Sequence, residues 1–509
     1  SGWIDTQKVH ISSAIASVYK YMLIVTSDEA KARKMCDDAS FFNKEAIYYP
    51  AKDAKFYSAD VHGNQITGER IRCISRIINH SSTGEGVLTV VSTMDGIADR
   101  LIPVERFKEA VITLDYSSEI EPEKLAKKLV AMGFVRTGMV EDKGQFAIRG
   151  GIIDIFSYTD EAPVRIELWD TEVDSIRMFD VESQRSIERL QSYSIFPATE
   201  YIFTEDELKN GLYNIKEECD RQLECFDYGK RKRTKEQIEA GNNLNKLVAD
   251  VERTGNYEKF TDTLVADTVG LAEYFPEENT LVVLDEPNRL KECNELTLYE
   301  YNESMKNRLA AGYVLPSQTN KVKAMNEIIS DLRNNKKLIL TTLDYKPEGF
   351  EIDYSMYITA RSISSYNNSF EYLAKDLEKY KKNGYTTILV CSSRTRALRI
   401  VDDLGKLGIA SFYSEDFNKD YGSGLIIVTY GSLHKGFEYP VLSFVVIAEN
   451  DIFSARKMKK LKKKKHDGKN IASFNELNIG DYVVHESHGL GVYKGKEKIQ
   501  VEGVEKDYI

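Results

Sequence analysis

The chain has 509 residues, 29% of them charged, and a formal net charge of −11 at pH 7, the composition of a multidomain globular protein. The negative charge argues against a protein coated in nucleic-acid contacts, and no apolar run reaches the roughly 18 residues of a transmembrane helix. Six scattered cysteines without a C-x-x-C pair, and a start without the regions of a signal peptide, predict a cytoplasmic protein with reduced thiols and no metal site.

The N-terminal part alternates predicted helices with apolar strands. Helices are expected over 10–19, 29–36 and 68–79, and strands over 21–26, 47–49 and 87–92. Strands that are apolar without a break are typical of a parallel sheet buried on both faces. A further apolar strand at 280–284 belongs to the same α/β region and ends in the acidic pair Asp285-Glu286, which has the form of a Walker B motif.

The pattern changes near residue 135. Short strands with tight turns between them are expected over 144–150, 152–157, 164–170 and 175–181. They predict an antiparallel meander inserted into the first domain. Helices follow over about 205–253. A second α/β unit is expected to hold a helix over 370–383 and strands over 387–391, 424–429 and 443–448, and a β-rich tail begins near residue 473.

These patterns divide the chain into seven segments. They are an α/β domain at 1–110, an inserted β domain at 111–200, a return to the α/β core at 201–358, a polar linker at 359–370, a small α/β domain at 371–452, a basic linker at 453–472 and a partial β domain at 473–509. The stretch from Ser454 to Asn470 carries nine Lys or Arg and one Asp. A solvated linker is the plainer interpretation, and a strap from Arg456 to Lys465 that contacts DNA phosphates is the alternative.

The first residues nearly match the phosphate-binding loop pattern G-x-x-x-x-G-K-[ST]. Gly2 and Lys8 fall in register, but Gln7 replaces the second glycine and Val9 replaces the hydroxyl residue. Val9 cannot ligate Mg²⁺, and Gln7 carries a side chain where the backbone must approach the phosphates. Taken alone, the match is as well explained by chance. Its place before a helix, together with Asp285-Glu286, favours a nucleotide site that has lost its chemistry.

Three segments resemble known repair proteins. Residues 144–180 and 270–287 are similar to corresponding stretches of UvrB, and residues 478–509 are similar to the opening of a CarD-like RNA polymerase interaction domain. Together they resemble the N-terminal half of bacterial transcription-repair coupling factors, the Mfd family. The resemblance implies a multidomain α/β fold: a degenerate RecA/P-loop-like UvrB-homology domain with an inserted antiparallel β domain, a second small α/β domain and a partial Tudor/CarD-like barrel.

The resemblance also implies a function. This part of the family is expected to be a non-catalytic adaptor without a cofactor, which recruits UvrA to RNA polymerase stalled at DNA lesions, while the ATP-driven translocase lobes lie beyond residue 509. The loop around Lys8 is then a vestige kept for the fold, with Lys8 a surface or N-terminal lysine. An ATP-dependent repair helicase of the UvrB kind is the main alternative, and a nucleic-acid-binding scaffold is another.

The inserted β domain offers a binding face from its own residues. In VRIELW at 164–169, period-2 alternation puts Arg165 and Trp169 on the face opposite the apolar side chains, and Arg149 takes the equivalent side of QFAIR. A tryptophan with arginine neighbours on a polar face is typical of an interface anchor. The alternative is that Trp169 packs under a loop or beneath an arginine stem.

The resemblance assigns roles to four residues of these segments. Arg149, Arg165 and Trp169 match positions at which the family contacts UvrA, with Trp169 replacing a Phe. In the tail, Ile499 matches an apolar position that meets the RNA polymerase β subunit. A core position in a small barrel is the alternative for Ile499, and alternation along the strand leaves both open.

Overall fold

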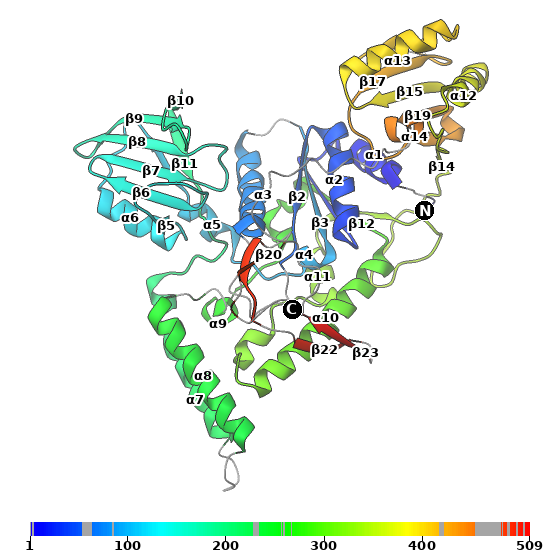
Figure 1. The fold of residues 1–509 in the computed structure, drawn as a ribbon. Helices are drawn as coiled ribbons and strands as arrows, with labels where there is room; N and C mark the ends of the chain where they lie inside the picture. Colours follow the sequence, from blue (N-terminus) through cyan, green and yellow to red (C-terminus); the bar gives the residue numbers. More distant parts are fainter. Residues whose placement is uncertain are drawn as a thin grey trace.

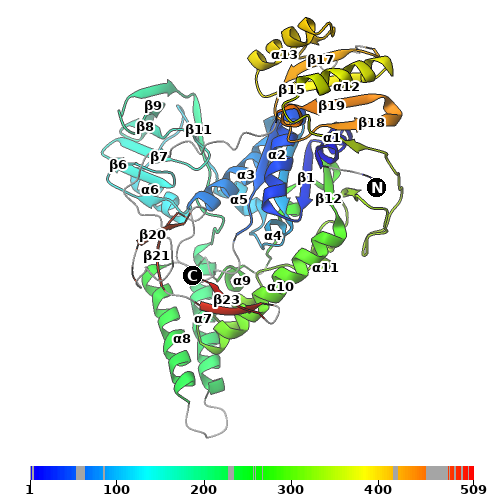
Figure 2. The same cartoon turned by 45° about the vertical axis from the view of Figure 1, so that its right-hand side comes forward.

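The computed structural model shows a central α/β body flanked by a largely antiparallel β domain on one side and a second α/β domain on the other, with a long helical hairpin projecting from the body (Figures 1 and 2). The structure describes all residues except 1, 3–4, 53–63, 84–85, 227–233, 256, 258–259, 266, 417–421, 454–479, 481, 486–488, 495–496, 502–503 and 509. Among the described helices, none is long and apolar enough to cross a membrane. All six cysteines are free thiols.

The central body is built on a five-stranded parallel sheet with the order β13-β12-β1-β3-β2. Its strands are β1 (Tyr21–Thr26), β2 (Glu45–Tyr49), β3 (Leu88–Thr93), β12 (Thr280–Asp285) and β13 (Lys336–Leu340). Its helices are α1 (Asp5–Ala16), α2 (Glu29–Asn43), α3 (Asn64–Thr83), α4 (Met94–Ile97), α5 (Val104–Ala110), α10 (Pro287–Ala310) and α11 (Met325–Asp331). Every residue of β1, β3 and β12 is buried, which confirms the expected sheet covered on both faces. The prediction of a helix over 10–19 is wrong at both ends, because α1 spans residues 5–16.

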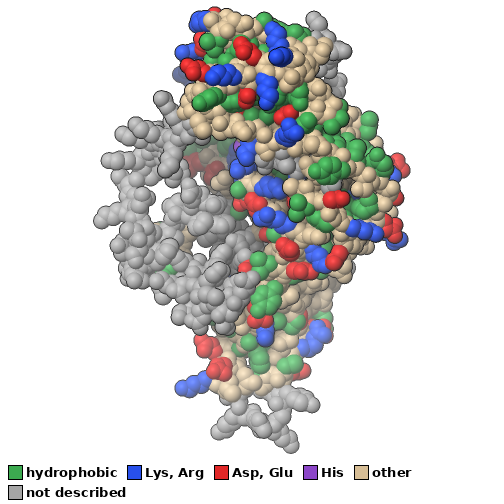
Figure 3. Space-filling model, turned by 90° about the vertical axis from the view of Figure 1, so that its right-hand side faces the viewer, with side chains coloured by type: hydrophobic (Ala, Val, Ile, Leu, Met, Phe, Trp, Pro, Cys, Tyr) green, Lys and Arg blue, Asp and Glu red, His purple; other side chains and the backbone are tan. Residues whose placement is uncertain are grey.

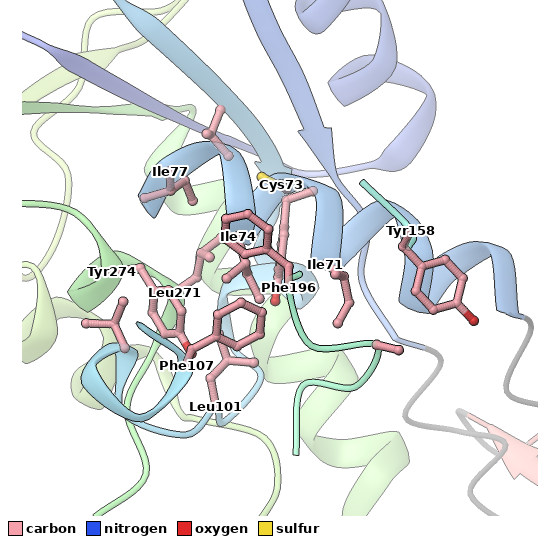
Figure 4. Close-up of a cluster of buried hydrophobic side chains, with 14 of the residues drawn as sticks. Ile71, Cys73, Ile74, Ile77, Leu101, Phe107, Tyr158, Phe196, Leu271 and Tyr274 are labelled. Atoms are coloured by element: carbon pink, nitrogen blue, oxygen red, sulfur yellow. The ribbon is translucent and has the colours of Figure 1, made fainter. Parts of the chain in front are cut away.

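The larger hydrophobic core joins the central sheet to the inserted domain. Apolar residues at helical spacing on α3 face it, including Ile71, Ile74 and Ile77 (Figure 4). Phe107 of α5 and Phe196, near the end of the inserted domain, pack against the same helix. This shared core therefore holds the end of the inserted domain against the central body.

A buried ion cluster holds the same junction. Arg70 of α3 is fully buried, and its Nε donates to Glu200 Oε1 at 2.5 Å while its Nη1 donates to Asp99 Oδ2 at 2.7 Å. Although burial alone raises the pKa of a carboxyl, the charges of Arg70 and Lys52 lower the pKa of Glu200 to about 2. The insertion is therefore tied to the core by charge as well as by apolar packing.

The inserted domain contains a six-stranded sheet, in which β5 runs parallel to β6 while the other neighbouring strands are antiparallel, and one separate antiparallel pair. Its six-stranded sheet has the order β10-β9-β8-β7-β6-β5, and β4 pairs with β11 separately. The elements are β4 (Ile112–Asp115), α6 (Pro122–Ala131), β5 (Val135–Arg136), β6 (Gln145–Arg149), β7 (Ile152–Phe156), β8 (Val164–Trp169), β9 (Glu172–Phe179), β10 (Ser186–Arg189) and β11 (Ser192–Ile195). The expected antiparallel meander is confirmed for β6 to β9. The β4–β11 pair, which brings the two ends of the insertion together, has no counterpart among the expected strands.

The helical hairpin and its surroundings return the chain to the central sheet. They contain α7 (Glu205–Phe226), α8 (Lys235–Thr254), α9 (Thr261–Leu264) and the short 3₁₀ turns Leu271–Tyr274, Glu277–Asn279 and Pro316–Thr319. A capping box at Thr234 and Gln237 begins α8, and Gly255, with φ of 63°, ends it. The expected helical region over 205–253 is confirmed as two helices.

The second α/β domain has a six-stranded mixed sheet with the order β14-β18-β19-β15-β17-β16. Its elements are β14 (Arg361–Ser362), α12 (Phe370–Lys382), β15 (Thr386–Cys391), α13 (Arg394–Lys406), β16 (Phe412–Tyr413), β17 (Ile426–Tyr430), β18 (Phe437–Tyr439), a 3₁₀ turn (Pro440–Leu442), β19 (Phe444–Ala448) and α14 (Glu449–Ile452). The polar stretch expected as a linker contributes to this domain, because β14 pairs with β18 and Tyr366 is buried in the core.

The tail holds four described strands in two separate antiparallel pairs. They are β20 (Tyr482–His485) with β21 (Gly489–Val492), and β22 (Glu497–Val501) with β23 (Val504–Tyr508). No hydrogen-bonded ladder joins the two pairs among the described residues. The basic segment from Arg456 to Lys465 lies outside the described residues.

The second α/β domain docks on α1 and α2 of the central body. Asp38 of α2 is buried and accepts hydrogen bonds from Thr6 Oγ1 and from His434 N, both at 2.8 Å. The His434 ring lies 3.1 Å from the same carboxylate, whose hydrogen bond and charge raise the pKa of His434. On α1, burial lowers the pKa of His10 to about 4, and His10 Nδ1 lies 2.9 Å from the Tyr439 hydroxyl. Polar contacts thus fix one orientation of the two domains.

Replacing Asp38→Ala should loosen this docking, because the His434 amide and Thr6 hydroxyl lose their acceptor. Such a loss costs roughly 1–3 kcal/mol. In scanning calorimetry, the second α/β domain is expected to unfold in a separate transition below that of the central body. Asp37→Ala is the matched control, since Asp37 is 65% exposed and 3.8 Å from the His434 ring. Equal effects of the two substitutions would contradict the assigned role of Asp38.

Candidate functional site

The lysine of the near-miss phosphate loop is buried and paired with the acidic pair at the end of β12. The Lys8 side chain is 4% exposed, and its Nζ donates to Asp285 Oδ1 at 2.6 Å and to Glu286 Oε1 at 2.7 Å. Lys8 and Asp285 therefore meet at the carboxyl edge of the parallel sheet, where nucleotides bind in folds of this type. The expectation that Lys8 is a surface lysine is wrong.

A second lysine completes this cluster. Lys31 of α2 pairs with Asp285 Oδ2, which also accepts a hydrogen bond from Thr26 Oγ1 at 2.7 Å. Burial alone would raise the pKa of Asp285, but the charges of Lys8 and Lys31 outweigh it and hold this pKa below its usual range. In a working phosphate site, Mg²⁺ and the nucleotide meet these groups. Here the protein's own ammonium groups compensate the acidic residues.

The remaining loop positions are used for packing. Val9 is fully buried in the core between α1, α2 and the central sheet. Gln7 is also fully buried and hydrogen-bonds the hydroxyl of Tyr439 in the second α/β domain. Gly2 has φ of 84°, and a Cβ there would lie 2.4 Å from the carbonyl oxygen of Ile358. Each substitution away from the phosphate-loop pattern thus has a structural use.

The inserted β domain carries the second candidate site. Its sheet has an apolar face, on which Phe146, Ile153 and Ile166 are fully buried. The register places Asp154 opposite Arg165, which puts both on the other face. Arg149 shares that face by alternation along β6. The predicted division of this sheet into an apolar and a polar face is confirmed.

The two arginines of this face share one carboxylate. Arg165 donates from Nε to Asp154 Oδ1 at 2.6 Å and from Nη2 to Asp154 Oδ2 at 2.9 Å. Arg149 Nη2 donates to the same Oδ2 at 2.6 Å. The Arg149 side chain is 43% exposed, whereas the Arg165 side chain is 13% exposed. Arg165 therefore lies on the predicted face but is mostly covered.

Trp169 is the most exposed aromatic side chain of this domain among the described residues, at 79%. It ends β8 beside the turn at Asp170, whose φ is 59°. The neighbouring turn between β6 and β7 approaches closely, because a Cβ on Gly151 would lie 2.9 Å from the carbonyl oxygen of Leu168. Arg149 and Trp169 consequently end neighbouring hairpins at the same end of the sheet. Packing of Trp169 under a loop is excluded.

Sequence reasoning missed three residues that build the two sites. Asp154 contacts both Arg149 and Arg165. Gln184 contacts Arg165, and Lys31 contacts Asp285. A signal for Asp154 was available, since it is the lone charged residue of the apolar strand IIDIF. Gln184 gave no such signal, because it lies in a turn whose φ of 57° is visible only in the structure.

The tail contains the residue predicted to meet RNA polymerase. Ile499 lies in β22 with its backbone opposite Lys506. Its role at an interface stays a prediction, as does DNA contact by residues 456–465. On the face shown in Figure 3, the described Lys and Arg side chains are interspersed with Asp and Glu, so no uniformly basic surface appears among them.

Lys8→Ala is expected to destabilise the central body rather than to abolish nucleotide binding. Removing one partner of a buried ion pair costs about 3–5 kcal/mol because the other charge stays buried. The loss is measured as a lower unfolding midpoint, with the exposed Lys20→Ala as control. A titration with a fluorescent ATP analogue and Mg²⁺ should show no saturable binding to either protein. Micromolar binding that Lys8→Ala removes would refute the closed site.

The same ion pairs predict a stability loss in acid. The folded-state pKa of Asp285 lies below its unfolded value, so its contribution is fully present above the unfolded pKa and is lost as the pH falls through the folded one. The unfolding midpoint should therefore decline below roughly pH 4. In Lys8→Ala this decline should be shallower, and an identical pH profile would argue that Lys8 does not stabilise the ionised carboxylate.

The chain is similar to known proteins over nearly its whole length. A family described as "UvrB interaction domain" matches residues 112–201, and one described as "CarD-like/TRCF RID domain" matches residues 477–509. The transcription-repair-coupling factor of Bacillus subtilis is 31% identical over 518 residues, 99% of this chain and 42% of the relative. Those of Staphylococcus haemolyticus and Staphylococcus aureus are 29% and 28% identical over 96% and 98% of this chain. The chain spans 41–42% of the length of these relatives. With nearly every residue aligned to such proteins, the chain belongs to the family of transcription-repair-coupling factors.

Proposed function

We propose that this chain acts in the cytoplasm as a non-catalytic adaptor of transcription-coupled DNA repair, which recruits UvrA to RNA polymerase stalled at DNA lesions. The observation that carries the proposal is the exposed Trp169 on the same sheet end as Arg149, within the region that matches the UvrB interaction domain. The family match to the CarD-like domain supports the polymerase end of the adaptor.

The chemistry of the face suits protein binding. A tryptophan that is 79% exposed has a large apolar area to bury, and arginine and tryptophan are enriched among the residues that dominate interface energies. The sheet beneath is rigid, because its other face is packed in the main core. A partner that presents an apolar side chain beside a carboxylate would satisfy both Trp169 and Arg149.

An ATP-dependent helicase of the UvrB kind is less well supported for this part of the family. Its chemistry needs a metal ligand at the position of Val9 and a lysine free to meet phosphates. Val9 is in the core, and Lys8 is paired with Asp285 and Glu286. The proposal therefore assigns no catalytic residue to this chain.

The polymerase contact is assigned to the tail. We place the RNA polymerase β subunit against β22, with Ile499 as the apolar contact, because this strand falls within the CarD-like match. The segment from Arg456 to Lys465 would add weak, salt-dependent contact with DNA phosphates. Both assignments extend the adaptor proposal and rest on sequence.

Trp169→Ala should weaken UvrA binding by about 2 kcal/mol or more, since a buried aromatic anchor is lost. The measurement is calorimetric titration of purified UvrA into the 509-residue chain. The fold should be retained, because the side chain is mostly in solvent. Val135→Ala is the matched control: Val135 is 60% exposed on β5, the edge strand of the same sheet.

Two outcomes would count against the proposed face. Full UvrA affinity in Trp169→Ala would remove Trp169 from the interface. An equal loss in Trp169→Ala and Val135→Ala would indicate a general effect on the domain instead of an anchor. Circular dichroism of each variant separates either outcome from unfolding.

A further inference from the structure

We infer that Asp154 is a positioning residue of the proposed UvrA-binding face. Through its contacts with both arginines, Arg165 has a structural role and Arg149 is held in place to contact the partner. This inference rests on the proposed function and concerns how the same face is built. Its starting point is the single carboxylate that both guanidinium groups share.

Three of the five N–H donors of Arg165 are already used within the protein. Its Nε and Nη2 form a bidentate pair with Asp154, and Nη2 also donates to Gln184 Oε1 at 2.8 Å. Its guanidinium carbon lies 4.3 Å from the centroid of the Phe179 ring, which covers the group further. The edge that would grip a partner's carboxylate is therefore used internally.

Arg149 is in the opposite situation. Among the described residues it makes one side-chain hydrogen bond, from Nη2 to Asp154 Oδ2, and it remains 43% exposed. A guanidinium has five N–H donors, and this hydrogen bond uses one of them. Asp154 itself is 1% exposed and cannot reach a partner. Two arginines around one carboxylate leave a single excess positive charge, and Arg149 is where it is accessible.

Asp154 does more than neutralise charge. Without it, two guanidinium groups would lie close together and repel each other, and Arg149 would lose the contact that fixes its direction. A fixed arginine loses less conformational freedom on binding, so Asp154 should slow dissociation of the complex. It should not speed association, because its negative charge opposes an acidic partner. The partner chemistry that fits is a carboxylate next to an apolar side chain.

The test measures association and dissociation rates of purified UvrA on the 509-residue chain for the parent, Asp154→Asn, Arg149→Ala and the double variant. Asp154→Asn should raise the dissociation rate about tenfold while the association rate stays the same or rises. Arg149→Ala should weaken binding about tenfold or more. If Asp154 acts through Arg149, the double variant binds no worse than Arg149→Ala alone.

Further variants keep the result interpretable if Asp154→Asn fails to fold. Asp154→Glu keeps the charge but moves the carboxylate, so it should also raise the dissociation rate. Arg149→Lys should be weaker than the parent with an unchanged unfolding midpoint, whereas Arg165→Lys should lower that midpoint as well. Arg136→Ala, at a 48% exposed arginine of β5, is the control.

The outcomes separate the inference from the proposed function. If Trp169→Ala and Arg149→Ala both bind UvrA like the parent, the face itself is wrong. If both lose affinity but Asp154→Asn and Asp154→Glu dissociate like the parent, the face stands and the positioning role is overturned. Additive effects of Asp154→Asn and Arg149→Ala would likewise overturn it, because independent residues do not act through each other.

Discussion

The arrangement of the molecule depends on the buried ion pair between Lys8 and Asp285. Lys8 stands at the position whose lysine meets phosphates in an active phosphate-binding loop, and here it joins α1 to the end of β12. A charge pair of this kind contributes less net stability than its Coulomb energy suggests, because both ions are desolvated. The main effect of the ion pair is to orient α1. Because Lys8 is held by Asp285, α1 presents one fixed face to the rest of the protein.

That orientation determines where the second α/β domain sits. The turn of α1 that contains Lys8 also carries Thr6 and Gln7, which contact Asp38 and Tyr439. The residues at which the sequence predicts a loss of nucleotide chemistry therefore also make the contact between the domains. The Gln7 side chain would obstruct a phosphate in a phosphate-binding loop. The same side chain contacts Tyr439 of the second α/β domain.

The sequence predicts much of the fold but little of the contacts that Lys8 and Gln7 make. Strand β1 is found at its correct bounds because an unbroken apolar run marks a doubly covered strand. α1 is misplaced because its buried face contains Gln7 and Lys8, so hydrophobic periodicity does not reveal where it begins. Alternation places Arg149, Arg165 and Trp169 on one face. Alternation does not predict that Asp154, on the strand between the two arginines, pairs with Arg165. That ion pair depends on the register between β7 and β8, which the sequence pattern does not give.

The two sites use the same arrangement, a buried carboxylate between two cations, with different consequences. Asp285 is fully buried between Lys8 and Lys31, whose side chains are 4% and 35% exposed, and each cation is directed at the carboxylate. Asp154 is as deeply buried, but Arg149 is 43% exposed and makes one side-chain hydrogen bond within the part of the chain that the structure describes. A cation whose donors are used internally can only hold a fold together. A cation that is held at one donor and solvated at the others is both fixed in direction and available to a partner. Lys31 and Arg149 are similarly exposed, at 35% and 43%, so exposure alone does not distinguish the two sites. A guanidinium has five N–H donors and an ammonium has three, so Arg149 can keep more donors than Lys31 for the partner proposed at the inserted domain.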